Sequence, residues 1–177
     1  PIQRLNPNQF YKVCPESKNE DLQPICGDGS PFCFYVSKPS QKNANRDKLM
    51  IEVMGGGVCW DSNTCQKQQD MLYVDGSLDN ALGKSCQELQ YGMQAEGAQT
   101  NMLCGMQLGS DDANVDFTEY NAIIIPYCTQ DVHLGSKTMT YYESDNDDDN
   151  QNYENYMQVH HKGGNNLHAV MRWIFRN

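Results

Sequence analysis

Three consecutive glycines are the residues whose type and spacing in this sequence best suit chemistry. Gly55, Gly56 and Gly57 follow a short, mostly apolar segment at 49–54 and precede Cys59. Because glycine has no Cβ, main-chain N–H groups at such a bend can approach another atom closely and donate hydrogen bonds to it. That arrangement suits a developing negative charge, as in the oxyanion hole of an acyl-transfer enzyme.

Two other interpretations of the glycines compete with an oxyanion hole. A phosphate cradle requires G-x-G-x-x-G opening a helix, or G-x-x-x-x-G-K-[ST]. Neither pattern fits residues 55–60, which contain no further spaced glycine and no lysine. A tight turn is the simpler alternative, and the three glycines alone favour it. The surrounding sequence therefore has to decide.

The elements expected to position the bend are two strands of a parallel sheet. Residues 49–54 have the length and β-branched content of a buried strand. Residues 122–126 contain three isoleucines in succession, which predicts a strand buried on both faces that ends at Pro126. The loop that follows would lie at the carboxyl end of the sheet, where open α/β sheets bind ligands.

The flanking segments complete the predicted sheet. An apolar patch at Phe10–Val13 and an aromatic-rich segment at 32–36 are predicted to form the first, antiparallel strands, separated by a turn at 26–31. Residues 163–177 are predicted to form an amphipathic helix that Asn165 or Asn166 caps. Its apolar residues recur at i, i+3, i+4 and i+7 and would pack on the sheet: Leu167, Val170, Met171 and Ile174.

These segments closely resemble the pectin acetylesterase and Notum family of serine carboxylesterases. Four blocks carry the resemblance in the correct order along the chain: CGDGSPFCFYV at 26–36, GGGVCW at 55–60 with a second cysteine at Cys65, NAIIIPYCTQDVHLG at 121–135, and the helical block 160–177. Two residues depart from the family pattern. Met54 stands where the family has glutamate, and Val58 stands where it has tryptophan.

The resemblance implies the N-terminal part of an α/β-hydrolase-like fold with a mostly parallel central sheet. It places oxyanion-hole amides at Gly56, Gly57 and Val58. No nucleophile elbow G-x-S-x-G occurs, because Ser30 and Ser136 lack its second glycine. We therefore expect residues 1–177 to be a single incomplete domain, truncated before the elbow, with the catalytic Ser, Asp and His all downstream.

The implied function is that of a carboxylic ester hydrolase whose serine nucleophile lies beyond these residues. The expected substrates are esters of an acetylated polysaccharide or an acylated protein, with no cofactor and no metal. The alternative is a secreted, disulfide-rich binding protein that keeps the scaffold without catalysis. Met54 and Val58 keep that alternative open.

Charge excludes one class of partner. The formal net charge of −10, with no clustered lysine or arginine, argues against nucleic acid. No segment approaches the about 20 apolar residues of a membrane span.

Eight cysteines, an even number spread along the chain, favour disulfides and a secreted or lumenal location: Cys14, Cys26, Cys33, Cys59, Cys65, Cys86, Cys104 and Cys128. Their connectivity stays open, since eight cysteines allow about 105 pairings. Zinc is the alternative, but zinc sites usually bring cysteines in close C-x₂-C pairs, which are absent from this sequence.

Two polar segments are predicted to be excursions from the sheet. Residues 61–116 form a disulfide-tied insertion, with a possible short helix at 85–93. Residues 143–155 form an acidic, solvated loop. A calcium loop is the alternative there, but it fails at its diagnostic positions, which hold Asn150 and Tyr156 in place of glycine and glutamate.

The remaining polar candidates are assigned structural roles. His133 is a tempting general base, but the family's histidine lies further downstream, so we expect a satisfied surface residue. Asp131 is expected to orient its loop through backbone N–H groups. His160, His161 and His168 form no H-E-x-x-H pattern and are interpreted as solvent or loop histidines.

Overall fold

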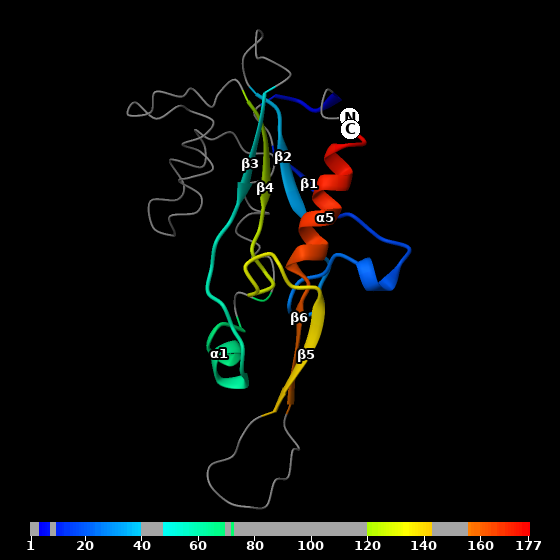
Figure 1. The fold of residues 1–177 in the computed structure, drawn as a ribbon. Coiled ribbons are helices and arrows are strands. Elements are labelled where there is room, and N and C mark those ends of the chain that lie inside the picture. Colours follow the sequence, from blue (N-terminus) through cyan, green and yellow to red (C-terminus); the bar gives the residue numbers. More distant parts are fainter. Residues whose placement is uncertain (1–3, 8–9, 40–47, 70–71, 73–119, 143–155) are drawn as a thin grey trace, which may run out of the picture.

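The computed structural model describes residues 4–7, 10–39, 48–69, 72, 120–142 and 156–177 (Figure 1). The predicted helix at 85–93, Cys86, Cys104 and the predicted acidic loop at 143–155 lie outside these residues.

A four-stranded mixed sheet forms the centre of the described structure. Its strands are ordered β1-β2-β4-β3 and span Phe10–Val13 (β1), Phe34–Ser37 (β2), Leu49–Val53 (β3) and Asn121–Ile125 (β4). β1 and β2 pair antiparallel, as the sequence predicted, and β2 also pairs antiparallel with β4. β3 and β4 pair parallel, so their carboxyl ends lie at the same edge of the sheet.

The two predicted parallel strands differ in burial. β4 is a core strand, since Ile123, Ile124 and Ile125 are each at most 1% exposed. The prediction that β3 is buried was wrong: Leu49 is 37%, Ile51 39% and Val53 47% exposed. The reason is position, because β3 is the edge strand of the described sheet and has a neighbour on one side only.

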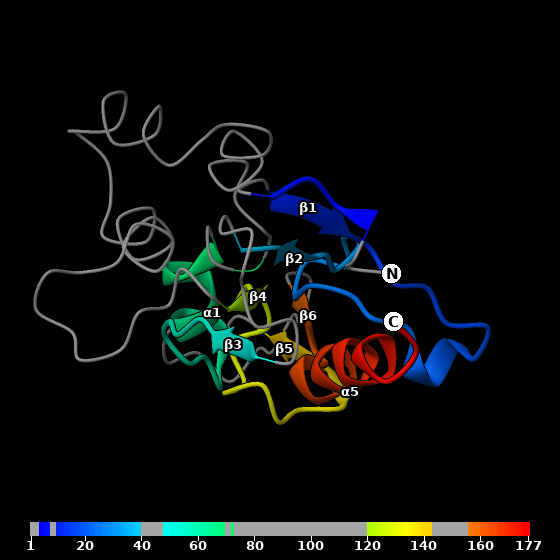
Figure 2. The same cartoon turned by 90° about the horizontal axis from the view of Figure 1, so that it is seen from above.

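Helix α5, Gly163–Ile174, lies along one face of the sheet (Figure 2). Leu167, Val170 and Ile174 pack into the core as the periodicity predicted, and Trp173 joins them through an edge-to-face contact with Phe34 at a 5.3 Å centroid distance.

The prediction that Asn165 or Asn166 caps α5 was wrong. The N-cap is Lys162, which makes no side-chain cap hydrogen bond. Asn165 and Asn166 instead donate from Nδ2 to the carbonyls of Asp21 and Ile25, at 2.6 and 2.9 Å. They tie the first turns of the helix to the N-terminal segment, beside the 3-10 turn η2 at Glu20–Leu22.

A hairpin of β5 (Lys137–Tyr142) and β6 (Tyr156–His161) precedes α5 and was not predicted. Alternation of apolar and polar residues on each strand is the signal that was missed. Tyr141, Met157 and Val159 face a small second core around the disulfide Cys59–Cys65 and Leu72.

Three disulfides join described residues: Cys14–Cys33, Cys26–Cys128 and Cys59–Cys65. The second links the start of the turn before β2 to the loop after β4, 102 residues along the chain. Within the described residues, no helix is both long and apolar enough to cross a bilayer.

The ionised side chain of Glu52 on β3 destabilises the folded state, because burial removes water from its carboxylate. One carboxylate oxygen is buried and finds no hydrogen-bond partner in the part of the chain that the structure describes, and desolvation by burial raises the pKa of Glu52 above 4.5. A folded-state pKa above the unfolded value stabilises the fold at pH below 4.5, and this contribution is lost as pH rises through the folded pKa.

We therefore predict that Glu52→Gln melts at a higher temperature than the wild type at neutral pH. The difference should shrink as pH falls through 4.5 and should be absent at about pH 3, where Glu52 is protonated in both states. Thermal melts at both pH values, with the exposed Glu16→Gln as control, check this; an equal gain at both values would contradict the charge explanation.

Candidate oxyanion site

The glycine bend lies directly after β3, at the carboxyl edge of the sheet (Figure 1). Met54 N–H makes the last bond to β4, donating to Ile125 O at 2.9 Å, and Cys59 N–H donates to Gln130 O at 3.3 Å. Between these anchors, the N–H groups of residues 56–58 donate no hydrogen bond to any described residue. Three successive main-chain donors at the carboxyl edge of the sheet therefore have no acceptor among the described residues.

Close packing explains why the bend needs glycine. A Cβ on Gly56 would overlap the ring of Tyr127, and a Cβ on Gly57 would overlap the side-chain amide of Gln68. A Cβ on Gly55 would meet nothing within 4 Å. Gly56 therefore packs closely against Tyr127 and Gly57 against Gln68, whereas Gly55 has room for a side chain.

Gly56→Ala should destabilise the fold by about 1–3 kcal/mol, because the Tyr127 ring has to move. Gly55→Ala, the matched control, should be neutral or slightly stabilising, because it only restricts the unfolded chain. Urea unfolding of both variants checks this. Equal losses would show that glycine is needed for its backbone conformation instead.

The loop after β4 braces the bend from one side. His133 Nε2 lies 2.8 Å from Met54 O, and its ring stacks at a tilt on Tyr127 at a 4.8 Å centroid distance. Tyr127 Oη accepts from Val132 N–H at 2.9 Å, and burial raises the pKa of this tyrosine, so its hydroxyl stays neutral. The interpretation of His133 as a surface residue was wrong, since it is 8% exposed and anchors the end of β3.

Asp131 organises this loop, as predicted. Its Oδ1 accepts from Thr129 Oγ1 at 2.7 Å and from His133 N–H at 3.1 Å. Its Oδ2 accepts from Gly135 N–H at 3.1 Å and from Gly163 N–H at 2.7 Å. The second pair joins the loop to the first residue of α5, where a carboxylate is also favoured by the helix dipole.

Backbone strain is concentrated in the same loop. Gln130, Val132 and His133 have φ angles of 56°, 58° and 58°, in the left-handed region. Val132 is β-branched, for which this conformation is unfavourable. Residues in such conformations persist only where their surroundings hold them, and they cluster at functional sites.

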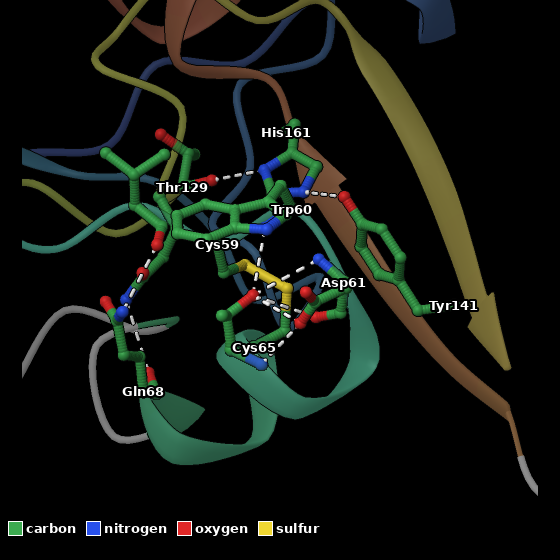
Figure 3. The surroundings of a disulfide bond; sticks show 11 residues. Cys59, Trp60, Asp61, Cys65, Gln68, Thr129, Tyr141 and His161 are labelled. Carbon is green, nitrogen blue, oxygen red and sulfur yellow. Dashed lines mark hydrogen bonds between the residues drawn. A yellow bond between two sulfur atoms is a disulfide. The ribbon is translucent and has the colours of Figure 1, made fainter. Parts of the chain in front are cut away.

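Helix α1, Ser62–Lys67, braces the bend from the other side (Figure 3). Asp61 caps it by accepting from Thr64 N–H at 2.7 Å, and hydrogen bonds from the backbone and side chain of Thr64 lower the pKa of Asp61. The disulfide Cys59–Cys65 ties the helix to the end of the bend. The predicted 61–116 insertion thus begins with an ordered helix, and its remainder after Leu72 lies outside the described residues.

The interpretation of two histidines as solvent or loop residues was wrong. His161 on β6 is 7% exposed, with Nδ1 2.8 Å from Thr129 O and Nε2 2.9 Å from Tyr141 Oη (Figure 3). His160 lies 2.8 Å from Thr138 Oγ1, and burial lowers its pKa. His168 is exposed on α5.

Among the described residues, only Cys59, Cys65 and His161 come close enough together to suggest a metal site. Their ligand atoms lie within 4.8 Å of one another. The two sulfurs are bonded to each other, however, and a cysteine binds zinc only as a free thiolate. In this state the cluster is a structural disulfide beside a satisfied histidine.

A groove of about 600 Å³ lies elsewhere, between residues 15–24 and the outer face of α5. None of its lining residues contacts the glycine bend, so it adds nothing to this site.

The described architecture defines a class of protein. A mixed sheet in this strand order, with a glycine bend after the edge strand β3 and a helix on one face, is part of an α/β-hydrolase-like fold. Two crystal structures of the Wnt deacylase Notum from Drosophila share it, with TM-scores of 0.55 and 0.54 at 17% and 14% identity. They cover 95% and 97% of this chain.

The chain belongs to the pectinacetylesterase family, whose model matches residues 16–176. A curated relative, the palmitoleoyl-protein carboxylesterase Notum of Schmidtea mediterranea, is 28% identical over 112 residues. That match covers 63% of this chain and 18% of the relative, and this chain spans 38% of each Drosophila structure.

The structure shows contacts around the glycine bend that could not be predicted from the sequence. Gly56, Gly57 and Val58 were singled out from the sequence, whereas Tyr127, Gln68 and Gln130 were not. A tyrosine and two glutamines in loops carry no spacing signal that could have indicated contacts with the bend.

Proposed function

We propose that this chain supplies the oxyanion-stabilising half of a carboxylic ester hydrolase. A serine downstream of residue 177, activated by a histidine, attacks the ester carbonyl, and the N–H groups of Gly56, Gly57 and Val58 hold the tetrahedral oxyanion. The tetrahedral intermediate collapses, the histidine gives its proton to the departing alcohol, and an acyl-serine remains. Water, losing a proton to the histidine, then attacks the acyl-serine and releases the acid and the free serine. One further donor is expected from the residue after the nucleophile.

The observation that carries this proposal is the set of amides at residues 56–58 that donate to no residue in the described part of the chain. Preorganised donors are effective because they need no rearrangement when charge develops. The bend meets that condition, since Tyr127 and Gln68 pack on its glycines and a disulfide follows it directly.

Substrate and location are part of the same proposal. The family description and the names of the two relatives point to an ester of an acetylated polysaccharide or of an acylated protein. Three disulfides are typical of a secreted or lumenal protein.

A fluorophosphonate probe tests the mechanism, because it labels activated serines. In the protein recovered from its source cells, we expect one labelled serine in a peptide that follows residue 177 in sequence. Purified 1–177 should remain unlabelled and should not hydrolyse p-nitrophenyl acetate above a buffer control. Labelling or saturable hydrolysis by 1–177 would show that the nucleophile lies within it.

The second candidate is a binding protein without catalysis, favoured by Met54 and Val58 at positions where the family pattern differs. It predicts that the natural protein carries no labelled serine at all. The same experiment therefore separates the two candidates.

A further inference from the structure

Gln68 is the residue directly after helix α1 (Figure 3), and its side chain contacts the glycine bend. Its Nε2 donates to Val58 O at 3.2 Å, and its carboxamide packs against the Cα of Gly57. The main-chain carbonyl of Gln68 accepts a hydrogen bond from Gln130 Nε2 at 3.2 Å. The side chain therefore touches two of the three residues whose amides form the proposed oxyanion site.

These contacts fix one peptide plane from both ends. The plane between Val58 and Cys59 is held at its carbonyl by Gln68 and at its N–H by Gln130 O, at 3.2 and 3.3 Å. A peptide unit is rigid, so holding both ends removes its rotation. The preceding plane, which carries Val58 N–H, is then confined between this fixed unit and the Gln68 side chain.

Gln68 also carries a cost for stability. Its Oε1 is buried and accepts no hydrogen bond from any described residue. The opposite assignment of the amide would place Oε1 against Val58 O, with two acceptors facing each other, so the donor orientation is the favourable one. A buried acceptor without a partner destabilises the fold, and an apolar side chain of similar shape would avoid that loss.

We propose that Gln68 is a positioning residue: it holds Val58 O and thereby aims the amides of the bend at the oxyanion. The proposal rests on the proposed function. The buried Oε1 of Gln68 is a stability cost that an apolar side chain would avoid, and local features that lower stability recur at functional sites.

Gln68→Met tests this, because methionine keeps the length of the side chain but cannot donate to Val58 O. In the natural protein, we expect the Cys59 amide to exchange about tenfold faster, with an equal or higher unfolding midpoint. Gln69→Met, at the exposed neighbouring position, is the matched control and should change neither. Unchanged Cys59 exchange would overturn the proposal.

Turnover supplies the second readout. In the protein that the fluorophosphonate probe labels, Gln68→Met should lower kcat about tenfold and leave KM within about twofold. Faster exchange with unchanged kcat would overturn the positioning role. If the natural protein carries no reactive serine, the proposed function fails, and the exchange result alone still decides whether Gln68 holds the bend.

Discussion

Removing the Cys26–Cys128 disulfide should cost the fold about 4–5 kcal/mol, the largest loss that we expect among the three described disulfides. The bond closes a loop with a sequence separation of 102 residues, and the chain-entropy contribution grows with loop length. It also joins the turn before β2 to the loop after β4, where Gly27 N–H donates to Cys128 O at 2.7 Å. Urea unfolding of the Cys26→Ser/Cys128→Ser double variant measures the loss.

The matched control is the Cys14→Ser/Cys33→Ser double variant. That bond spans 19 residues, so its removal should cost about 3 kcal/mol. Equal losses in the two variants, or a smaller loss for the long loop, would contradict the role given to Cys26–Cys128.

Asp131→Ala should destabilise the protein by about 3 kcal/mol and should loosen the bend as well. The carboxylate accepts four hydrogen bonds, two within its own loop, one from Gly135 and one from the start of α5. Without it, the left-handed conformations of Val132 and His133 lose their support. Because His133 anchors Met54, the end of β3 should relax too.

Urea unfolding gives the loss of stability for Asp131→Ala, and amide exchange at residues 54–59 reports the bend. The exposed Asp21→Ala is the control and should stay within about 0.5 kcal/mol of the wild type. If Asp131→Ala is destabilised but amide exchange at residues 54–59 stays as in the wild type, the loop after β4 does not hold the glycine bend in place.

The sequence allowed the core of the sheet to be predicted because its signals are local. Three isoleucines in a row predicted a strand buried on both faces, and β4 is that strand. The helical period at Leu167 and Val170 likewise predicted the buried face of α5. β3 was predicted as a strand, but its exposure depends on which neighbours flank it, and that is a property of the whole sheet.

The parts that escaped prediction depend on contacts distant in sequence. β5 and β6 are short strands separated by a long acidic segment, which hid their pairing. The sequence predicts a solvent or loop residue at His161, because nothing near it in sequence indicates that Thr129 and Tyr141 lie against both ring nitrogens. The candidate site shows the same division, since its glycines could be identified and the side chains that hold them could not.

The most direct test of the account replaces the Val58 amide by an ester in the protein that the fluorophosphonate probe labels. This change deletes one N–H donor and keeps the side chain and the shape of the bend. We predict a fall in kcat of about 100-fold, the loss expected for one oxyanion donor, while the same replacement at Gly55 has little effect. An unchanged kcat for the Val58 ester would contradict the claim that these main-chain amides stabilise the oxyanion.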